Sequence, residues 1–280
     1  MERGYQERTQ RRDMVKPNPI DVIDMGDNKP YFLPLDFIEI YCINIRKRPD
    51  RLEMFKEAAE EGKIYKINPS VQITTNWENN LDGEDITNEW LEEKKFGLFD
   101  WEMTEEDAKA IDVDWAKWWS RPLTQGEIGC TISHTEIWKK AKQHTLILED
   151  DVMFTVNWIS KLKLAMNNLN IIDKDWDLLY LGRVPQEDNE TKVHNNIVKP
   201  KFSFCTYAYM LSPKGIEKIQ QYNVERGIIP ADEFLSATYV KHPREDVSLK
   251  YPPTLNAYAI EPQIVLQRSK SVAGSDTGLP

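Results

Sequence analysis

Apolar and polar positions follow two periods along this chain, and the first clear pattern lies at residues 36–45. The sequence there, DFIEIYCINI, is rich in β-branched and aromatic residues and is typical of a central strand. A basic loop follows, and then a helical pattern that begins near Asp50 and ends at Gly62, where glycine suits the end of a helix. We expect a second strand at residues 63–68 (KIYKIN), which completes a strand–helix–strand unit with parallel strands.

The same periods continue through the second half of the chain. Residues 123–144 carry Ile128, Ile132, Trp138 and Ala141 on one side of a predicted helix. The other predicted elements are a strand at 145–152, a helix at 158–169, strands at 176–183 and 205–211, a helix after the turn at 212–213, and a last strand at 257–267 followed by a polar tail.

This order of elements predicts an α/β fold whose mostly parallel, Rossmann-like twisted sheet is flanked by helices. Residues 1–35 combine charge, proline and little apolar periodicity, so we expect a poorly ordered arm before a single domain at residues 36–280. No apolar run approaches the roughly 18 residues of a membrane-spanning helix, so no membrane span is expected. The charged N-terminal sequence also lacks the apolar segment of a secretory signal.

Charge and cysteine content narrow the functional classes. The net charge of −10 argues against nucleic acid as the main partner. Cys42, Cys130 and Cys205 are scattered and form no CxxC pair, so they are expected to be buried small apolar residues rather than disulfides or zinc ligands. The sequence does not decide the oligomeric state, and a homo-oligomer stays open.

The negative charge is concentrated in residues 71–120. This window holds fourteen Asp and Glu against four Lys, together with six of the nine tryptophans. One interpretation is a solvated helical insertion that its tryptophans anchor to the rest of the protein. The other is a surface that faces an acceptor, where acids attract a basic partner and indole rings offer flat faces to sugars or cations.

Three consecutive carboxylates, Glu149, Asp150 and Asp151, end the strand predicted at 145–152. Like charges that are partly withdrawn from water are costly unless a positive group lies among them. Open α/β sheets bind ligands at the carboxyl ends of their strands, and carboxylate oxygens suit Mg²⁺ or Mn²⁺. Strand alternation would point Glu149 and Asp151 one way and Asp150 the other. The alternative is a turn in which an acid caps the next helix.

The basic loop after the first strand would share this edge of the sheet with the acidic triplet. Arg46, Arg48 and Arg51 can reach phosphates or a base there, and Asn44 can hydrogen-bond to a nucleotide edge. Alone, such a loop is an ordinary charged surface. Its expected position at the carboxyl edge makes it a candidate nucleotide-binding segment.

Two further motifs contain candidate acid–base groups. IPADEFL places Asp232 and Glu233 between apolar residues, and a shielded carboxylate has the raised proton affinity that a general base needs. Asp232 could equally be a metal ligand or a helix cap. His134 in TISHTEIW and His242 in YVKHP are the histidines within patterned sequence, and each is either a site residue or a structural histidine.

Several motifs are missing from the sequence. It contains no GxxxxGK, GxGxxG, GxSxG or HExxH, and no His-x-Asp pair. P-loop NTPases, dinucleotide dehydrogenases, serine hydrolases, zinc metalloproteases and iron oxygenases with a facial triad are therefore unsupported.

Taken in order, these segments resemble glycosyltransferase family 25, which includes bacterial lipopolysaccharide galactosyltransferases and animal procollagen galactosyltransferases. The resemblance covers roughly residues 38–277, and the Glu-x-Gly-Cys-x-x-Ser-His block followed by Glu-Asp-Asp is its most specific part. PADEF with KHP resembles the collagen-modifying branch in particular. The matching blocks are INIRKRPDRLEMF, LTQGEIGCTISHTEIW, TLILEDDV, LLYLG, AYMLSPKGIEKI, PADEF, KHP and EPQIVLQRSKSVAGSD.

The resemblance implies a GT-A fold, a UDP-sugar donor, Mn²⁺ or Mg²⁺, and inversion at the anomeric carbon. It makes Asp232 either the base for the acceptor hydroxyl or a metal ligand. The implied metal ligands are Glu149, Asp151, Asp232 and His242, and the implied donor-binding residues are Asn44, Arg46, Arg48, Arg51, Gly126, Glu127, Ser133, His134 and Asp150. Unlike the collagen enzymes, this sequence shows no signal peptide or ER-retention ending, which favours a cytoplasmic, bacterial or viral setting over the ER lumen.

Three functional classes remain from the sequence. The leading one is transfer of galactose or glucose from a UDP-sugar to an acceptor hydroxyl. The others are a non-catalytic relative that binds carbohydrate or protein, and another metal-dependent phosphate enzyme such as a nucleotidyltransferase or phosphohydrolase. For the acceptor, the acidic window complements a basic collagen-like chain with hydroxylysine, and the alternative is a lipopolysaccharide or other glycan.

Overall fold

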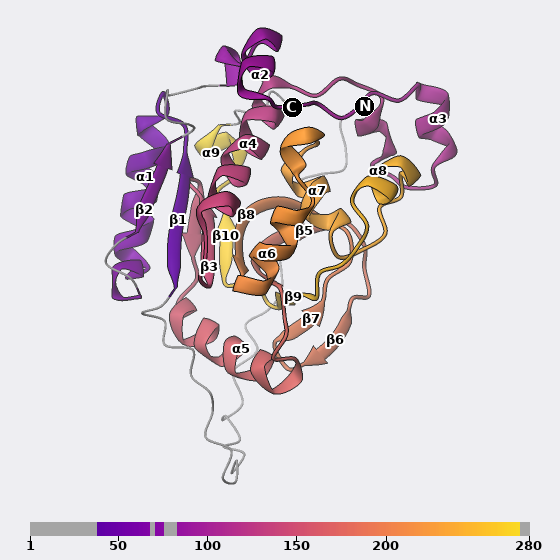
Figure 1. The fold of residues 1–280 in the computed structure, drawn as a ribbon. Coiled ribbons are helices and arrows are strands. Elements are labelled where there is room, and N and C mark those ends of the chain that lie inside the picture. Colours follow the sequence, from indigo (N-terminus) through magenta and orange to yellow (C-terminus); the bar gives the residue numbers. More distant parts are fainter. Residues whose placement is uncertain (1–37, 68–70, 76–82, 275–280) are drawn as a thin grey trace. The chain divides into compact units, whose positions relative to one another are not determined.

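A computed structural model describes residues 38–67, 71–75 and 83–274, which lie within one unit at residues 32–280. The predicted arm at residues 1–35 lies outside the described residues. The described strands form one eight-stranded and one two-stranded sheet (Figure 1). They are β1 (Glu39–Asn44), β2 (Gln72–Thr75), β3 (Thr145–Glu149), β4 (Val152–Phe154), β5 (Leu178–Pro185), β6 (Thr191–His194), β7 (Ile197–Lys199), β8 (Ser203–Leu211), β9 (Ala257–Ile260) and β10 (Val265–Gln267).

The order of strands in the large sheet is β2-β1-β3-β8-β5-β9-β7-β6, and β10 pairs with β4 in the small sheet. The pairs β1–β2, β1–β3 and β5–β9 are parallel, whereas β8 and β7 run against their neighbours. The predicted α/β class is therefore confirmed, but the sheet is mixed rather than mostly parallel, since three of its seven strand pairs are parallel. In the β1–β3 pair Ile43 lies opposite Glu149, which brings the basic loop and the acidic triplet to the same edge.

Helices cover both faces of the large sheet because its strands send alternate side chains to two apolar clusters. Ile40 and Cys42 of β1 join the cluster that contains α1 and α5, and Tyr41 and Ile43 join the one that contains α4, α6 and α7. The helices are α1 (Pro49–Glu61), α2 (Asn88–Lys94), α3 (Glu105–Ala110), α4 (Gln125–Lys140), α5 (Trp158–Ile172), α6 (Pro213–Gln221), α7 (Ala231–Ala237), α8 (Glu245–Lys250) and α9 (Lys270–Ala273).

Two of the predicted strands need correction. Residues 64–66 form a 3₁₀ turn, and the edge strand is β2. Ile64 and Ile67 are both buried, and their spacing of three suits a 3₁₀ turn rather than the alternation of a strand. The strand predicted at 257–267 is two strands, β9 and β10, which belong to different sheets. The segment between them contains Pro262, which cannot donate a ladder hydrogen bond.

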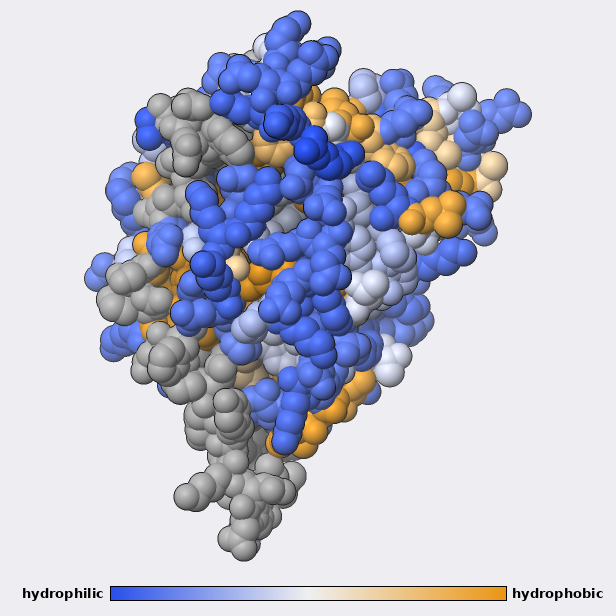
Figure 2. Space-filling model, in the orientation of Figure 1, coloured by the Kyte–Doolittle hydropathy of each residue, from blue (hydrophilic) through white to orange (hydrophobic). Residues whose placement is uncertain are grey.

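The acidic window begins with strand β2 and is otherwise described as short helices, 3₁₀ turns and the loops between them, and its tryptophans pack toward the protein. Trp101 and Trp119 are buried, and Trp115 stacks on Phe202 at 5.3 Å between ring centroids. The acids of α3 are exposed, and Figure 2 shows hydrophilic residues over α2. These tryptophans therefore fit the interpretation in which they anchor the insertion to the rest of the protein. Trp77 lies outside the described residues.

None of the helices in the described ranges is long and apolar enough to cross a membrane.

Candidate active site

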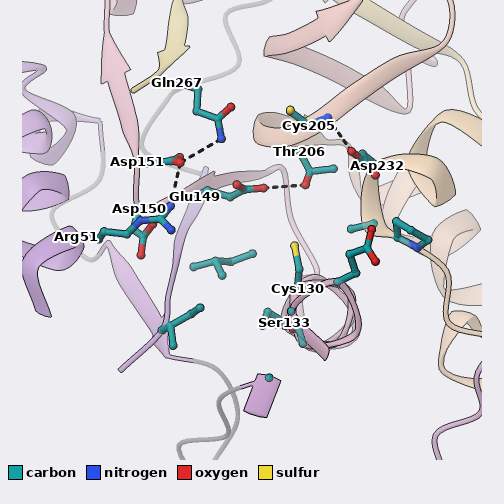
Figure 3. A pocket seen from close by; sticks show the side chains of 18 of the residues that line it. Arg51, Cys130, Ser133, Glu149, Asp150, Asp151, Cys205, Thr206, Asp232 and Gln267 are labelled. Carbon is teal, nitrogen blue, oxygen red and sulfur yellow. Dashed lines mark hydrogen bonds and ion pairs between the residues drawn. The ribbon is translucent and has the colours of Figure 1, made fainter. Parts of the chain in front are cut away.

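A cavity of about 260 Å³ opens at the carboxyl ends of β1 and β3. Several segments that lie far apart in the sequence form its wall, and Figure 3 shows many of their side chains. Its lining comprises Ile43, Ile45 and Arg51; Gly83 with Gly126, Glu127, Gly129, Cys130 and Ser133; Glu149, Asp150 and Asp151; Cys205, Thr206, Pro230, Ala231 and Asp232; and Gln267, Lys270 and Gly274.

Asp150 and Asp151 share one guanidinium group. Arg51 Nη2 lies 2.6 Å from Asp150 Oδ1 and 2.9 Å from Asp151 Oδ2. Asn44 donates a hydrogen bond of 2.7 Å to the other oxygen of Asp150. Strand alternation predicted that Glu149 and Asp151 would point the same way and Asp150 the other. Instead, Asp150 and Asp151 lie together against Arg51. The reason is that β3 ends at Glu149, so strand alternation no longer governs the next two residues.

Asp151 has a carboxylate oxygen that could coordinate a cation. Its Oδ2 accepts from Gln267 at 3.1 Å, but its Oδ1 is buried without a hydrogen-bond partner in the described part of the chain. Burial, followed by the charge of Glu149, raises the pKa of Asp151 to about 7. An unpaired carboxylate oxygen among other carboxylates fits Mn²⁺ or Mg²⁺, which take hard oxygen ligands.

Glu149 belongs to a different set of contacts from its two neighbours. Thr206 Oγ1 donates to Glu149 Oε1 at 2.8 Å, and His134 Nε2 lies 3.6 Å from the same oxygen. Burial alone would raise the pKa of Glu149, but its contacts with the His134 and Thr206 side chains and the charge of Arg51 outweigh burial and lower the pKa. Glu149 is thus held ionised next to Asp151, whose pKa is raised.

Asp232 stands across the cavity from the acidic triplet, in the first turn of α7 (Figure 3). Its carboxylate accepts from the backbone N–H groups of Cys205 at 3.0 Å and Glu233 at 2.9 Å. Burial and the charge of Glu233 nevertheless raise its pKa to about 7. A carboxyl group with that proton affinity can take up or release a proton near neutrality.

Comparison with known proteins identifies the family. The sequence profile described as Glycosyltransferase family 25 (LPS biosynthesis protein) matches residues 37–235. The chain belongs to glycosyltransferase family 25. The resemblance inferred from the sequence blocks is therefore confirmed.

Relatives of the chain differ in the activity that their names state. Procollagen galactosyltransferase 1-A of Xenopus laevis is 30% identical over 90% of this chain and 39% of its own length. The human procollagen galactosyltransferase 2 is 30% identical over 82% of this chain and 35% of its own length. The human inactive glycosyltransferase 25 family member 3 is 26% identical over 81% of this chain and 36% of its own length. The chain thus spans less than half of these relatives.

A solved structure also matches, but loosely. It is that of a glycosyltransferase involved in the glycosylation of the major capsid of PBCV-1, with 12% identity, a TM-score of 0.34, and coverage of 86% of this chain and 99% of that one. Similarity at this level supports no argument about the present site.

Not every residue that the family resemblance implied lies on the cavity wall. Those on the wall are Arg51, Gly126, Glu127, Ser133, Glu149, Asp150, Asp151 and Asp232, and those off it are Asn44, Arg46, Arg48, His134 and His242. Arg46 is exposed, while Asn44 is buried beside Asp150. Arg48 pairs with Asp50 at 2.8 Å and donates to the carbonyl of Ala273 at 2.6 Å, so it holds α9 beside the cavity.

His242 has no lone pair to offer a metal. Its Nδ1 accepts from the backbone N–H of Arg244 at 3.0 Å, so the ring proton is on Nε2, which donates to Glu233 at 2.8 Å. Trp119 donates to the second oxygen of Glu233 at 2.9 Å. His242 is therefore a buried structural histidine, and we remove it from the candidate metal ligands.

Glu127 lines the cavity, but both oxygens of its carboxylate already accept hydrogen bonds. It completes a capping box with Thr124 at the start of α4, accepting from the Thr124 backbone N–H at 2.9 Å. Arg121 contacts both of its oxygens, at 2.6 and 2.8 Å. Glu127 therefore stabilises the start of α4 and forms part of the cavity wall, and its carboxylate is not available as an acid or base.

Several wall residues escaped the sequence-based prediction. Cys205 has a left-handed backbone (φ 66°) where β8 shifts register against β5, and this irregularity aims its N–H at Asp232. Gln267 and Lys270 come from the C-terminal segment. Cys130 Sγ, His134 and Glu149 offer ligand atoms within 4.8 Å of one another. The Gly-Cys spacing of the family block was the available signal for Cys130.

Proposed function

We propose that this chain is a metal-dependent, inverting transferase that moves galactose or glucose from a UDP-sugar to an acceptor hydroxyl. The observation that carries the proposal is one cavity with Asp151 Oδ1 unpaired on one wall and Asp232, with its raised pKa, on the other. Membership of family 25 supports a glycosyl donor.

The cation would be held by Asp151, with Glu149 or Asp150 as the second carboxylate. When bound, it supplies positive charge against the departing diphosphate. Arg51 already lies against Asp150 and Asp151, and Lys270 lines the same cavity. We expect both side chains to bind phosphate oxygens, with Arg51 offering a planar fork of donors.

Asp232 would act on the acceptor. An acceptor hydroxyl is a weak nucleophile, so its proton must leave as its oxygen bonds to the anomeric carbon and the bond to the diphosphate oxygen breaks. The Asp232 carboxylate takes that proton. Its two backbone hydrogen bonds hold the side chain in place, and burial keeps its proton affinity high.

For the acceptor we propose a basic collagen-like chain with hydroxylysine. Two of the relatives are named procollagen galactosyltransferases, and the acids around α3 are exposed. A surface of that charge attracts a lysine-rich chain. A glycan acceptor is the alternative, because the family description names lipopolysaccharide biosynthesis.

The test incubates the protein with Mn²⁺ and UDP-galactose or UDP-glucose, with a hydroxylysine-containing collagen-like peptide or an oligosaccharide as acceptor. UDP release with equimolar hexose transfer supports the proposal. Binding of UDP or sugar without turnover would instead place the chain with the relatives named as inactive. Release of pyrophosphate or inorganic phosphate would indicate a different phosphate enzyme.

A further inference from the structure

A line of hydrogen bonds runs from the apolar core under α4 to the cavity wall. Trp138, Tyr209, His134 and Thr206 are buried, and the last two members of the line, Thr206 and Glu149, lie on the cavity wall. The links are Trp138 Nε1 to Tyr209 Oη at 2.9 Å, Tyr209 Oη to His134 Nδ1 at 2.8 Å, His134 Nε2 to Thr206 Oγ1 at 3.2 Å, and Thr206 Oγ1 to Glu149 Oε1 at 2.8 Å.

The two ends of this line fix the position of every proton in it. The Trp138 indole can only donate, and an ionised Glu149 carboxylate can only accept. Thr206 has a single hydroxyl proton, which goes to Glu149, so the Thr206 oxygen must accept from His134 Nε2–H. His134 Nδ1 then carries the lone pair and accepts the proton of Tyr209. Four hydrogens serve four bonds, and no group is left over.

The other neutral form of His134 would break the line. With the proton on Nδ1, the Nε2 lone pair would face Thr206, whose one proton could then serve either His134 or Glu149 but not both. One buried acceptor would be left unpaired, which is unfavourable in an interior. The surroundings therefore select the Nε2–H form.

We propose that His134 is a positioning residue whose Nε2–H holds the Thr206 hydroxyl and through it aims the Glu149 carboxylate into the cavity. The inference deepens the proposed function and rests on it, since Glu149 is one of the acids placed at the cation. It also replaces the earlier expectation that His134 touches the donor, because His134 is fully buried and lies off the wall.

The same tautomer argues against a second cation between Cys130, His134 and Glu149. Those three ligand atoms are close enough to share an ion, but a metal needs the lone pair of an imidazole nitrogen. On His134 the nitrogen that faces this group carries the proton. Binding of a soft cation such as Zn²⁺ there is thus an outcome that the proposal excludes.

The first test is spectroscopic and does not depend on activity. The chain has four histidines, so ¹⁵N-histidine NMR of the whole protein, with His134→Gln to assign the signal, can report the tautomer. We expect a neutral Nε2–H ring. An Nδ1–H ring, or Zn²⁺ binding that is lost in both Cys130→Ser and His134→Gln, would overturn the proposal.

The second test uses variants that differ in the position of one N–H group. Glutamine can place its amide N–H where the ring Nε2–H lies, whereas asparagine ends near Nδ1. We expect His134→Gln to keep Mn²⁺ affinity in the presence of UDP and His134→Asn to weaken it by about 10–100-fold. Thr206→Ser should behave like the first and Thr206→Val like the second. His144→Gln, on a half-buried ring that packs against Trp176, is the control.

Equal losses in His134→Gln and His134→Asn would show a merely structural role and overturn the proposal. If the wild-type protein binds neither Mn²⁺ nor UDP, the proposed function fails, and the NMR tautomer still decides the hydrogen-bond line. Circular dichroism and melting temperatures check that each variant is folded. Should the asparagine variant not fold, the Thr206→Ser and Thr206→Val pair measures the same link.

Discussion

The exposed acids at residues 100–114 and the buried acids at the end of β3 are the same residue types in opposite surroundings. The first group faces solvent, where charges are screened over roughly 8–10 Å and contribute little to stability. Glu149, Asp150 and Asp151 instead each have named partners inside a cavity. The exposed acids are Asp100, Glu102, Glu105, Glu106, Asp107, Asp112 and Asp114.

The difference shows why charge density along a sequence is a poor guide to chemistry. The acids at residues 100–114 form a solvated surface, whereas the three acids at the end of the apolar strand β3 form a candidate cation site. Burial decides between these outcomes. An exposed carboxylate oxygen is hydrated, whereas a buried unpaired oxygen such as Asp151 Oδ1 can still coordinate a ligand.

The largest effect is expected for Asp151→Asn. Removing the carboxylate that would hold the cation should lower kcat/KM by about 10³-fold. The melting temperature should stay level or rise, since one of three close negative charges is lost. Asp112→Asn removes an exposed acid and is the matched control, expected to keep full activity. Near-normal turnover of a folded Asp151→Asn protein would contradict the metal-binding role.

Asp232→Asn should lower kcat by about 100-fold or more, because the acceptor hydroxyl loses its base. The pH profile sharpens this prediction. With a pKa raised to about 7, Asp232 is mostly protonated below pH 7, so wild-type activity at saturating Mn²⁺ should rise with pH and level off above pH 7. A wild-type profile that is flat from pH 5.5 to 8 would remove Asp232 as the base.

His242→Ala tests Glu233, a buried acid whose partner His242 has a structural role. Glu233 accepts from His242 and Trp119, so loss of the ring leaves a buried carboxylate partly unpaired. We expect the free energy of unfolding to fall by about 3 kcal/mol. Denaturant unfolding measures this, and Mn²⁺ affinity of the folded fraction should be unchanged. Loss of Mn²⁺ affinity without loss of stability would restore His242 as a metal ligand.

The predicted strands and helices that proved correct had strong local signals. The β1–α1 and α4–β3 segments combine clear periodicity with a glycine stop or a Thr124–Glu127 capping box, so neighbours along the chain suffice to define them. Local patterns could also place the acidic triplet beside the basic loop, because parallel strands bring their carboxyl ends together.

What remained beyond prediction depends on contacts between distant segments. The left-handed backbone of Cys205 follows from a register shift between β8 and β5, and Gln267 reaches Asp151 from a strand of the second sheet. His134 and His242 look alike in sequence, and only their hydrogen-bond partners show which nitrogen carries the proton. Such assignments require coordinates.

The smallest effect concerns the exposed acids themselves. The triple variant Glu102→Lys, Glu106→Lys and Asp112→Lys takes the net charge of residues 100–114 from −6 to 0, while the cap of α3, formed by Thr104, is kept. Because exposed charges act through a screened field, KM for a lysine-rich collagen-like peptide should rise only about 3–10-fold at low salt, with kcat unchanged. The gap between variant and wild type should close as salt rises, whereas the Asp151→Asn defect should persist. An unchanged KM at low salt would show that this surface does not attract the acceptor. The proposal of a basic acceptor would then lose the support that it takes from charge.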